Sequence, residues 1–305
     1  MKNTIGSKIK KIRERNGLTQ QEFARVLGYK DKSMIAHIEK GDSDMAYDKM
    51  ILLIDKFNID ANELFSSPKE VDDNQFQRLE LLIGKESLEI IKTKKVAVFG
   101  LGGVGGNVCD ALARSGVQDF VLIDHDKVDI SNINRQLISN LNVIGQYKVD
   151  VMKRHLKSIN QNIRVLMKKM FYLPENSLDF DFKQYDYVID AIDTVSAKID
   201  IICKCHELGV PVISALGCGN KLDPTMLEIS DISKTSYDPL AKVLRRELRK
   251  RNINHLKVVY SKESPIEPKE KIISKNKKVV PASSAFVPPV AGIIIASEVI
   301  KVFLN

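Results

Sequence analysis

Residues 96–105 read Val96-Ala97-Val98-Phe99-Gly100-Leu101-Gly102-Gly103-Val104-Gly105. The apolar run has the length and composition of a buried strand, and the glycines after it allow a tight turn that opens a helix. Such a turn offers free backbone N–H groups and the partial positive charge of a helix N-terminus, which together suit a phosphate. We therefore expect a nucleotide phosphate to bind at the loop glycines, which are Gly100, Gly102, Gly103 and Gly105.

Apolar segments that end in a turn recur along the chain at 121–123, 187–189 and 212–213, and the first two run into an aspartate. Helical patterns lie between them. Alternation of this kind predicts a mostly parallel sheet with helices on both faces, and so a Rossmann-like α/β fold.

The nucleotide is indicated by residues near the predicted strand ends. Asp124 follows the glycine loop by about 20 residues, where an acid contacts ribose hydroxyls. The loop and this acid would also suit a nicotinamide dinucleotide, or a tight turn that binds no nucleotide. Arg135, Lys148 and Asp193 favour ATP, because cations stabilise charge on the phosphates and a carboxylate holds magnesium. We expect them to meet at the sheet's crevice.

The N-terminal residues 1–66 have a different pattern, typical of a small all-α domain. Helices are predicted at 20–27, 32–40 and 47–57, and Thr19 with Glu22 forms a capping box before the first of these. A polar stretch at 67–74 is the predicted linker. The predicted Rossmann-like domain then occupies 75–305.

Composition limits the class of protein. The chain has 305 residues, of which 44% are hydrophobic and 28% charged, and its net charge of +8 favours a polyanionic partner. Its four cysteines form no C-x-x-C pair, so we expect free thiols in a reducing cytoplasm. No signal peptide is expected, and the apolar stretch 286–304 contains Glu298 and Lys301, which favours a core or interface helix over a membrane span.

These residues together resemble the ubiquitin-activating-like adenylyltransferases, which include the ThiF-like enzymes. The resemblance rests on the glycine loop, Asp124, the run 131–136, Lys148 and Asp193. It implies that Asp124 binds ribose and that Lys148 grips the phosphates of ATP. It further implies phosphate contacts from Asn132 and Arg135, and a magnesium ligand in Asp193.

The same resemblance assigns a role to Arg78, in Phe76-Gln77-Arg78-Leu79. It matches an arginine that members of the superfamily lend across a dimer to the γ-phosphate side of the partner's site. The resemblance therefore implies a homodimer with Arg78 as a catalytic residue in trans.

A narrower similarity covers residues 75–304, to the tRNA threonylcarbamoyladenosine dehydratases. It is carried by 78–84, 189–195, 220–225 and 286–292, and by 234–245 between them. It implies that ATP activates a threonyl carboxylate on a modified tRNA adenosine as an acyl-adenylate. Ring closure with net loss of water follows.

One departure from the wider superfamily concerns cysteine. Members that activate ubiquitin-like carriers or transfer sulfur often carry paired C-x-x-C motifs or a thioester cysteine in the C-terminal half. This chain has no cysteine after Cys218, which we interpret as a packed thiol. Adenylation of a ubiquitin-like sulfur carrier is therefore the less favoured alternative.

The N-terminal segments 18–24 and 35–41 resemble the phage-repressor class of helix-turn-helix. That fold would point Lys32, Ser33 and His37 at the major groove of DNA. A transcription regulator whose second domain only senses a nucleotide is thus an alternative, as is a protein-docking module. The intact set of Arg135, Lys148 and Asp193 favours an enzyme.

A basic helix is predicted near residues 240–251. Its apolar residues fall on one face, and arginines and lysines occupy much of the rest, with Glu247 as the nearby acid. A solvated surface is one interpretation. We favour contact with tRNA phosphates beside the active site, with a looser contact at 269–278. The expected contacts are Arg245, Arg246, Arg249 and Arg251.

Overall fold

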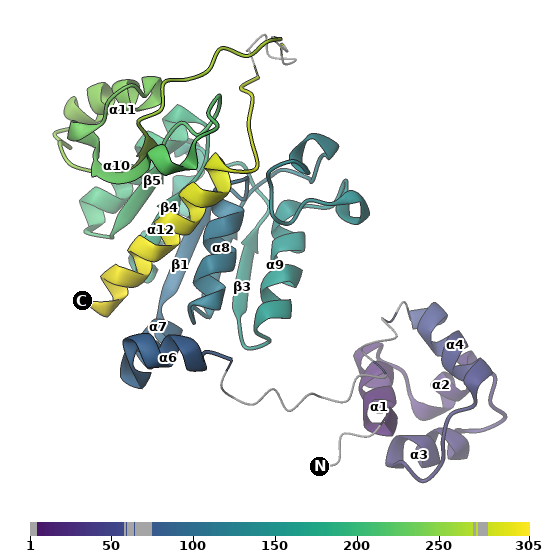
Figure 1. The fold of residues 1–305 in the computed structure, drawn as a ribbon. Coiled ribbons are helices and arrows are strands. Elements are labelled where there is room, and N and C mark those ends of the chain that lie inside the picture. Colours follow the sequence, from purple (N-terminus) through teal and green to yellow (C-terminus); the bar gives the residue numbers. More distant parts are fainter. Residues whose placement is uncertain (1–4, 58, 60–63, 65–74, 271–272, 274–279) are drawn as a thin grey trace. The chain divides into compact units, whose positions relative to one another are not determined.

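The chain forms two compact units, Met1–Gln75 and Phe76–Asn305, and each is described by itself. The predicted linker at 67–74 lies outside the residues described by the structure, a computed structural model. Those residues are 5–57, 59, 64, 75–270, 273 and 280–305 (Figure 1).

The first unit is helical, as predicted. The capping box is present, since Thr19 Oγ1 accepts from the backbone N–H of Glu22 while Glu22 accepts from the backbone N–H of Thr19. Buried apolar side chains from every helix form one core. The helices are α1 (Ile5–Arg15), α2 (Gln20–Val26), α3 (Lys32–Lys40) and α4 (Tyr47–Phe57).

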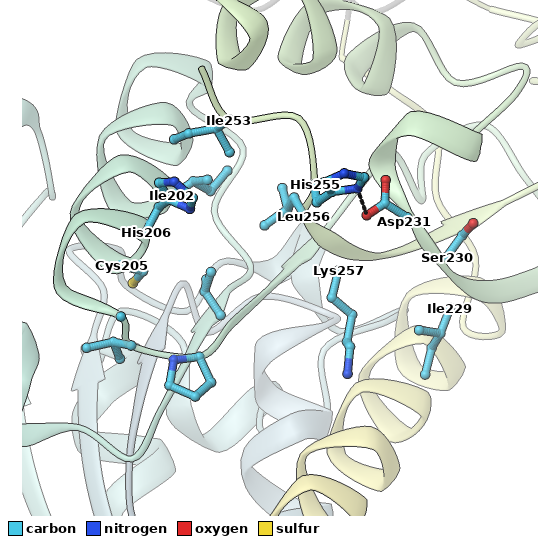
Figure 2. A pocket seen from close by; sticks show the side chains of 14 residues that line it. Ile202, Cys205, His206, Ile229, Ser230, Asp231, Ile253, His255, Leu256 and Lys257 are labelled. Carbon is cyan, nitrogen blue, oxygen red and sulfur yellow. Dashed lines mark hydrogen bonds and ion pairs between the residues drawn. The ribbon is translucent and has the colours of Figure 1, made fainter. Parts of the chain in front are cut away.

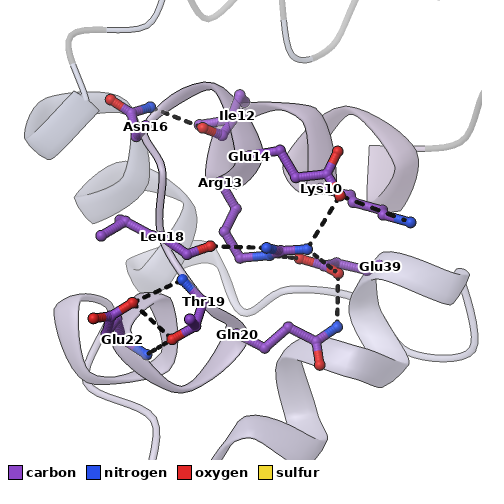
Figure 3. A network of polar contacts seen from close by, with 10 residues as sticks. All are labelled: Lys10, Ile12, Arg13, Glu14, Asn16, Leu18, Thr19, Gln20, Glu22 and Glu39. Atoms are coloured by element: carbon purple, nitrogen blue, oxygen red, sulfur yellow. Dashed lines mark hydrogen bonds and ion pairs between the residues drawn. The ribbon is translucent and has the colours of Figure 1, made fainter.

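A buried polar network ties three of these helices together (Figure 3). Arg13 of α1 donates from Nε to Glu39 Oε1 of α3 at 2.6 Å, and from Nη1 to the carbonyl of Leu18 at 2.8 Å. Gln20 of α2 donates to the other oxygen of Glu39 at 2.9 Å. Because Glu39 is buried, this pairing fixes how α3 lies against α1 and α2.

The second unit contains a seven-stranded sheet in the order β3-β2-β1-β4-β5-β7-β6. All neighbours are parallel except β6 and β7, so the predicted mostly parallel sheet is confirmed. The strands are β1 (Lys95–Phe99), β2 (Asp119–Ile123), β3 (Arg164–Lys168), β4 (Tyr187–Asp190), β5 (Val212–Ala215), β6 (Leu227–Asp231) and β7 (Lys257–Ser261).

Helices cover both faces of this sheet (Figure 1). Val96 and Val98 of β1 face one core, which contains residues of α7, α8, α9 and α12. Ala97 and Phe99 face the other, with α10 and an aromatic cluster. The helices are α6 (Gln77–Ile83), α7 (Lys85–Thr93), α8 (Gly105–Arg114), α9 (Lys148–Ile159), α10 (Val195–Leu208), α11 (Pro239–Arg249) and α12 (Val287–Leu304).

Helix α12 is long and apolar enough to cross a membrane by length and composition alone. In the fold it packs along α8, and a Cβ added at Gly292 would overlap the carbonyl oxygen of Val104. Eight of its residues are buried. The helix thus packs as a core helix, as the charges within its sequence predicted.

Candidate active site

The glycine loop connects β1 to α8 at the carboxyl edge of the sheet. Gly100 has φ of +90°, and a Cβ on it would lie 2.6 Å from the carbonyl oxygen of Ala191. A Cβ on Gly105 would overlap the carbonyl oxygen of Gly100. By contrast, the position above Gly102 is open, with its nearest neighbour, Gln136 Nε2, at 3.9 Å. The first and last glycines therefore shape the turn, and Gly102 leaves its backbone accessible to a ligand.

Asp124 lies directly after β2 and holds this loop. Its Oδ2 accepts from the backbone N–H of Leu101 at 2.6 Å, and its Oδ1 accepts from that of Asp126 at 2.7 Å. The side chain is buried and lines a cavity beside the loop. Each carboxylate oxygen can accept more than one hydrogen bond, so acceptor capacity remains for a ligand hydroxyl.

Lys148 is the first residue of α9, and its side chain is only 6% exposed. Its Nζ lies 2.7 Å from Asp126 Oδ2, and both residues line the same cavity. Sequence reasoning missed Asp126, although its place two residues after Asp124 was a usable signal. The ion pair holds the ammonium at the cavity.

The run 131–136 forms one wall of the cavity. Asn132 is buried, and its Oδ1 accepts from the backbone N–H of Asp129 at 3.1 Å. Arg135 donates from Nη1 to the carbonyl of Ser131 at 2.8 Å. Gln136, which was not predicted as a site residue, has a buried Oε1 without a hydrogen-bond partner among the described residues. This oxygen is an acceptor available to a ligand.

Asp193 follows β4 and is exposed at the same cavity. Within the described part of the chain, its carboxylate accepts one long hydrogen bond, from Thr194 Oγ1 at 3.4 Å. Asp124, His125 and Asp126 also offer closely spaced metal-ligand atoms. Both carboxylates in that group already serve Leu101 and Lys148, so the uncommitted carboxylate of Asp193 fits Mg²⁺ better.

The cavity enclosed by these residues has a volume of about 300 Å³. Its remaining wall is a segment after β3 that sequence reasoning missed, and Tyr172 within it donates to Asp200 of α10 at 2.6 Å. The apolar and aromatic run there was the available signal. These wall residues suit the base of a nucleotide: His125, Met170, Phe171, Tyr172 and Ile192.

Arg78 does not line this cavity. It is exposed on α6, which leads through α7 into the amino end of β1, at the edge of the sheet opposite the glycine loop (Figure 1). Its neighbours Leu81 and Leu82 are 84% and 81% exposed. Arg78 therefore cannot complete the site of its own chain in this arrangement.

A second, larger cavity of about 590 Å³ lies at the opposite edge of the sheet (Figure 2). It is lined by the first residues of β5 and β7 and by Asp231 at the end of β6, which lies 3.2 Å from His255. None of the predicted site residues lines it. The smaller cavity contains the glycine loop and the cations. We therefore assign the nucleotide to the smaller cavity, although the other has the larger volume.

Comparison with known proteins agrees with this geometry. The model of the ThiF family matches residues 74–305, and a helix-turn-helix model matches 9–64. The chain is 46% identical over 242 residues to the tRNA threonylcarbamoyladenosine dehydratase of Bacillus subtilis, across 76% of this chain and 95% of that protein.

The chain belongs to the ThiF family. A crystal structure of the Escherichia coli tRNA threonylcarbamoyladenosine dehydratase in complex with AMP matches with 30% identity and a TM-score of 0.69, over 75% of this chain and 94% of that one. A complex of the same enzyme with ATP matches equally, over 93% of its chain. The Rossmann-like fold expected from the sequence is therefore confirmed.

Within the ThiF domain, the basic helix α11 differs from expectation. Arg245 is half-buried and donates to the carbonyls of Ile232 and Thr235, at 3.3 and 2.8 Å, so it ties the helix to the fold. Asp238, the N-cap of α11, accepts from the backbone N–H of Gly217 near the end of β5. The helix therefore starts at the active-site edge of the sheet, and a contact between its arginines and tRNA stays a prediction.

The cations at the far end of α11 share one acid. Arg246, Lys250 and Arg251 all pair with Glu247, at 3.2, 2.9 and 3.3 Å. The hydrogen bond from Lys250, with those from the two arginines, lowers the pKa of Glu247 to about 2. Arg249 is exposed, and no side-chain partner is seen for it in the described chain. Three cations for one carboxylate leave a net positive surface.

The residues predicted to face DNA lie on α3 of the first unit. Lys32 and His37 are exposed, and His37 Nδ1 lies 3.6 Å from Asp42. Ser33 is also exposed, but its hydroxyl is hydrogen-bonded to Asp31, the N-cap of the helix. The serine hydroxyl thus supports the capping carboxylate of Asp31.

Cys218 is buried after β5, and burial raises the pKa of its thiol to about 11. We predict that Cys218→Ala leaves turnover unchanged, because the thiolate and not the thiol is the nucleophile. Alkylation of Cys218 should accelerate only as the pH approaches this pKa, which mass spectrometry can follow. Cys203→Ala is the matched control. Rapid alkylation at pH 7, or loss of turnover in Cys218→Ala, would contradict the assignment.

Proposed function

We propose that this protein catalyses the ATP-dependent dehydration of threonylcarbamoyladenosine in tRNA through an acyl-adenylate. The observation that supports this most directly is the convergence of the glycine loop, Arg135, Lys148 and Asp193 on one cavity. The choice of substrate rests on the Bacillus subtilis relative that is 46% identical, which is named a tRNA threonylcarbamoyladenosine dehydratase. We also propose that the protein acts in the cytoplasm and that the chain is organised as 1–66, 67–74 and 75–305.

The reaction follows from where the charges lie. A carboxylate oxygen of the substrate attacks the α-phosphorus of ATP, and pyrophosphate leaves. A nucleophile of the same modified nucleoside then attacks the acyl carbon, and AMP leaves with the carboxylate oxygen. ATP thus becomes AMP and pyrophosphate, while the nucleoside loses the elements of water.

Each residue of the cavity has a part in this scheme. The backbone of the loop and the start of α8 bind phosphate oxygens, and Asp124 binds the ribose. Asn132 and Arg135 contact the phosphates, and Lys148 moves from Asp126 to neutralise charge on them. Asp193 would hold Mg²⁺, which would supply positive charge beside the phosphates.

The alternative of a transcription regulator that only senses a nucleotide receives no support from the cavity. The cations and the carboxylate of Asp193 suit catalysis on the phosphates more than nucleotide sensing. The helix-turn-helix unit itself supports a separate proposal, that the chain also binds DNA through Lys32, Ser33 and His37.

The roles of Arg135 and Lys148 can be tested by turnover. Arg135→Ala and Lys148→Ala should each reduce it about 100- to 1000-fold, because one preorganised cation is removed from the transition state. Mass spectrometry of nucleosides after incubation with ATP, Mg²⁺ and tRNA measures the loss of water. Lys153→Ala on the same helix α9 is the matched control. Unchanged turnover in both variants would refute the assigned chemistry.

We propose a homodimer in which Arg78 completes the partner's site. Neither Arg78→Ala nor Asp193→Ala should turn over alone, whereas subunit exchange between them should restore part of the activity, since one hybrid site is whole. Light scattering measures the oligomeric state. In the control mixture, Arg114→Ala takes the place of Arg78→Ala, so that a different surface arginine is removed. A monomer at micromolar concentration, or no recovery after exchange, would contradict this.

We propose that tRNA phosphates contact Arg246, Arg249 and Arg251, with 269–278 as a looser contact that lies mostly outside the described residues. Arg249→Ala with Arg251→Ala should lower the salt slope of tRNA binding by about 0.7 to 0.9 per lost contact. Fluorescence anisotropy at several salt concentrations measures it, with Arg164→Ala on β3 as the control. An unchanged slope would leave α11 as a solvated surface.

A further inference from the structure

Lys198 lies in the first turn of α10 and is fully buried, an unusual place for a lysine. Its Nζ donates to Asp190 Oδ2 at 2.9 Å, to Ser214 Oγ at 3.2 Å and to the carbonyl of Ala215 at 2.8 Å. Ser214 in turn donates to Asp190 Oδ2 at 2.6 Å. All three ammonium hydrogens are thus used inside the protein, and Lys198 does not line the nucleotide cavity.

This cluster joins three elements at one point. Asp190 ends β4, Ser214 and Ala215 end β5, and Lys198 lies in the first turn of α10. A buried ion pair adds little net stability compared with apolar residues of similar size, whereas removal of one partner is costly. The arrangement therefore needs a reason other than stability.

The reason lies in the loop between β4 and α10, which carries Asp193. At the start of that loop, the Nζ of Lys198 binds the side chain of Asp190, and at its end the first helical hydrogen bond of α10 runs from the N–H of Lys198 to the carbonyl of Thr194 at 3.0 Å. The bonded ammonium therefore ties the start of α10 to the end of β4. Inside the loop, the N–H of Ala191 donates to the carbonyl of Phe99 at 2.8 Å, and Phe99 lies directly before the glycine loop. The hydrogen bonds of Lys198, Asp190 and Ser214 thus limit how far the loop that carries Asp193 can move from the glycine loop.

We propose that Lys198, through Asp190 and Ser214, is a positioning residue that holds the Asp193 carboxylate where it binds Mg²⁺ on the ATP phosphates. This inference rests on the proposed function. It assigns no contact between Lys198 and substrate. It requires that loosening of the cluster weakens ATP binding only when both Mg²⁺ and the carboxylate of Asp193 are present.

The test is ATP binding by calorimetry, with Mg²⁺ and with EDTA, on the full-length protein. Ser214→Ala keeps the Lys198–Asp190 ion pair and the bond from Lys198 to the carbonyl of Ala215, but removes the hydroxyl that donates to Asp190 and accepts from Lys198. We expect about 5- to 10-fold weaker ATP binding with Mg²⁺, comparable to the net contribution of one ordinary hydrogen bond. The affinity in EDTA should equal that of the parent.

A double-mutant cycle separates positioning from a general effect on the fold. In an Asp193→Asn background, Ser214→Ala should cause no further loss of affinity. Lys198→Met should behave like Ser214→Ala with a larger effect, and Lys204→Met at the other end of α10 should have none. If Lys198→Met does not fold, as judged by thermal unfolding, Ser214→Ala still decides the question.

The calorimetry distinguishes failure of the positioning role of Lys198 from failure of the proposed function. Equal losses with Mg²⁺ and EDTA, additive losses in the cycle, or no loss in Ser214→Ala would overturn the positioning role. If the parent itself does not bind ATP, the proposed function fails instead, before Lys198 is tested.

Discussion

Phe99, the last residue of β1, pairs with Ile123 of β2 on one side and with Asp190 of β4 on the other. This parallel register is the constraint on which the site depends. Because three strands end at the same level, the loops after them meet at one edge of the sheet. The glycine loop follows β1, Asp124 and Asp126 follow β2, and Asp193 follows β4. A shift of one residue in the register would reverse which face each strand presents to the core and separate these loops.

Close backbone packing makes this meeting of loops rigid. Gly100 lies against the carbonyl of Ala191, and Asp124 accepts from the N–H of Leu101, so each loop limits the position of its neighbour. On the outer side, Lys148 reaches the cavity from the start of α9 and is held by Asp126. The site is therefore largely preformed around its phosphate-binding part, as catalysis by fixed charges requires.

Much of this could be predicted from the sequence, because apolar strands, glycine turns and the acids after them are local patterns. The sheet, its helices on both faces and the gathering of Arg135, Lys148 and Asp193 at one cavity follow from such patterns. Asp126, Gln136 and the wall around Tyr172 were not predicted, since their importance comes from packing between distant segments. The bonds that hold Arg245 against the fold were not predicted for the same reason. Helical periodicity shows which face a side chain occupies, but not that Thr235 lies within its reach.

The central claim is that a substrate carboxylate is activated by attack on the α-phosphorus of ATP. Its most direct test uses tRNA whose threonylcarbamoyladenosine carries ¹⁸O in the carboxylate, incubated with the protein, ATP and Mg²⁺. Mass spectrometry of the nucleotide product should find one ¹⁸O atom in AMP and none in pyrophosphate, because AMP leaves with the carboxylate oxygen. Product AMP without the label, or ADP as the product, would contradict the account.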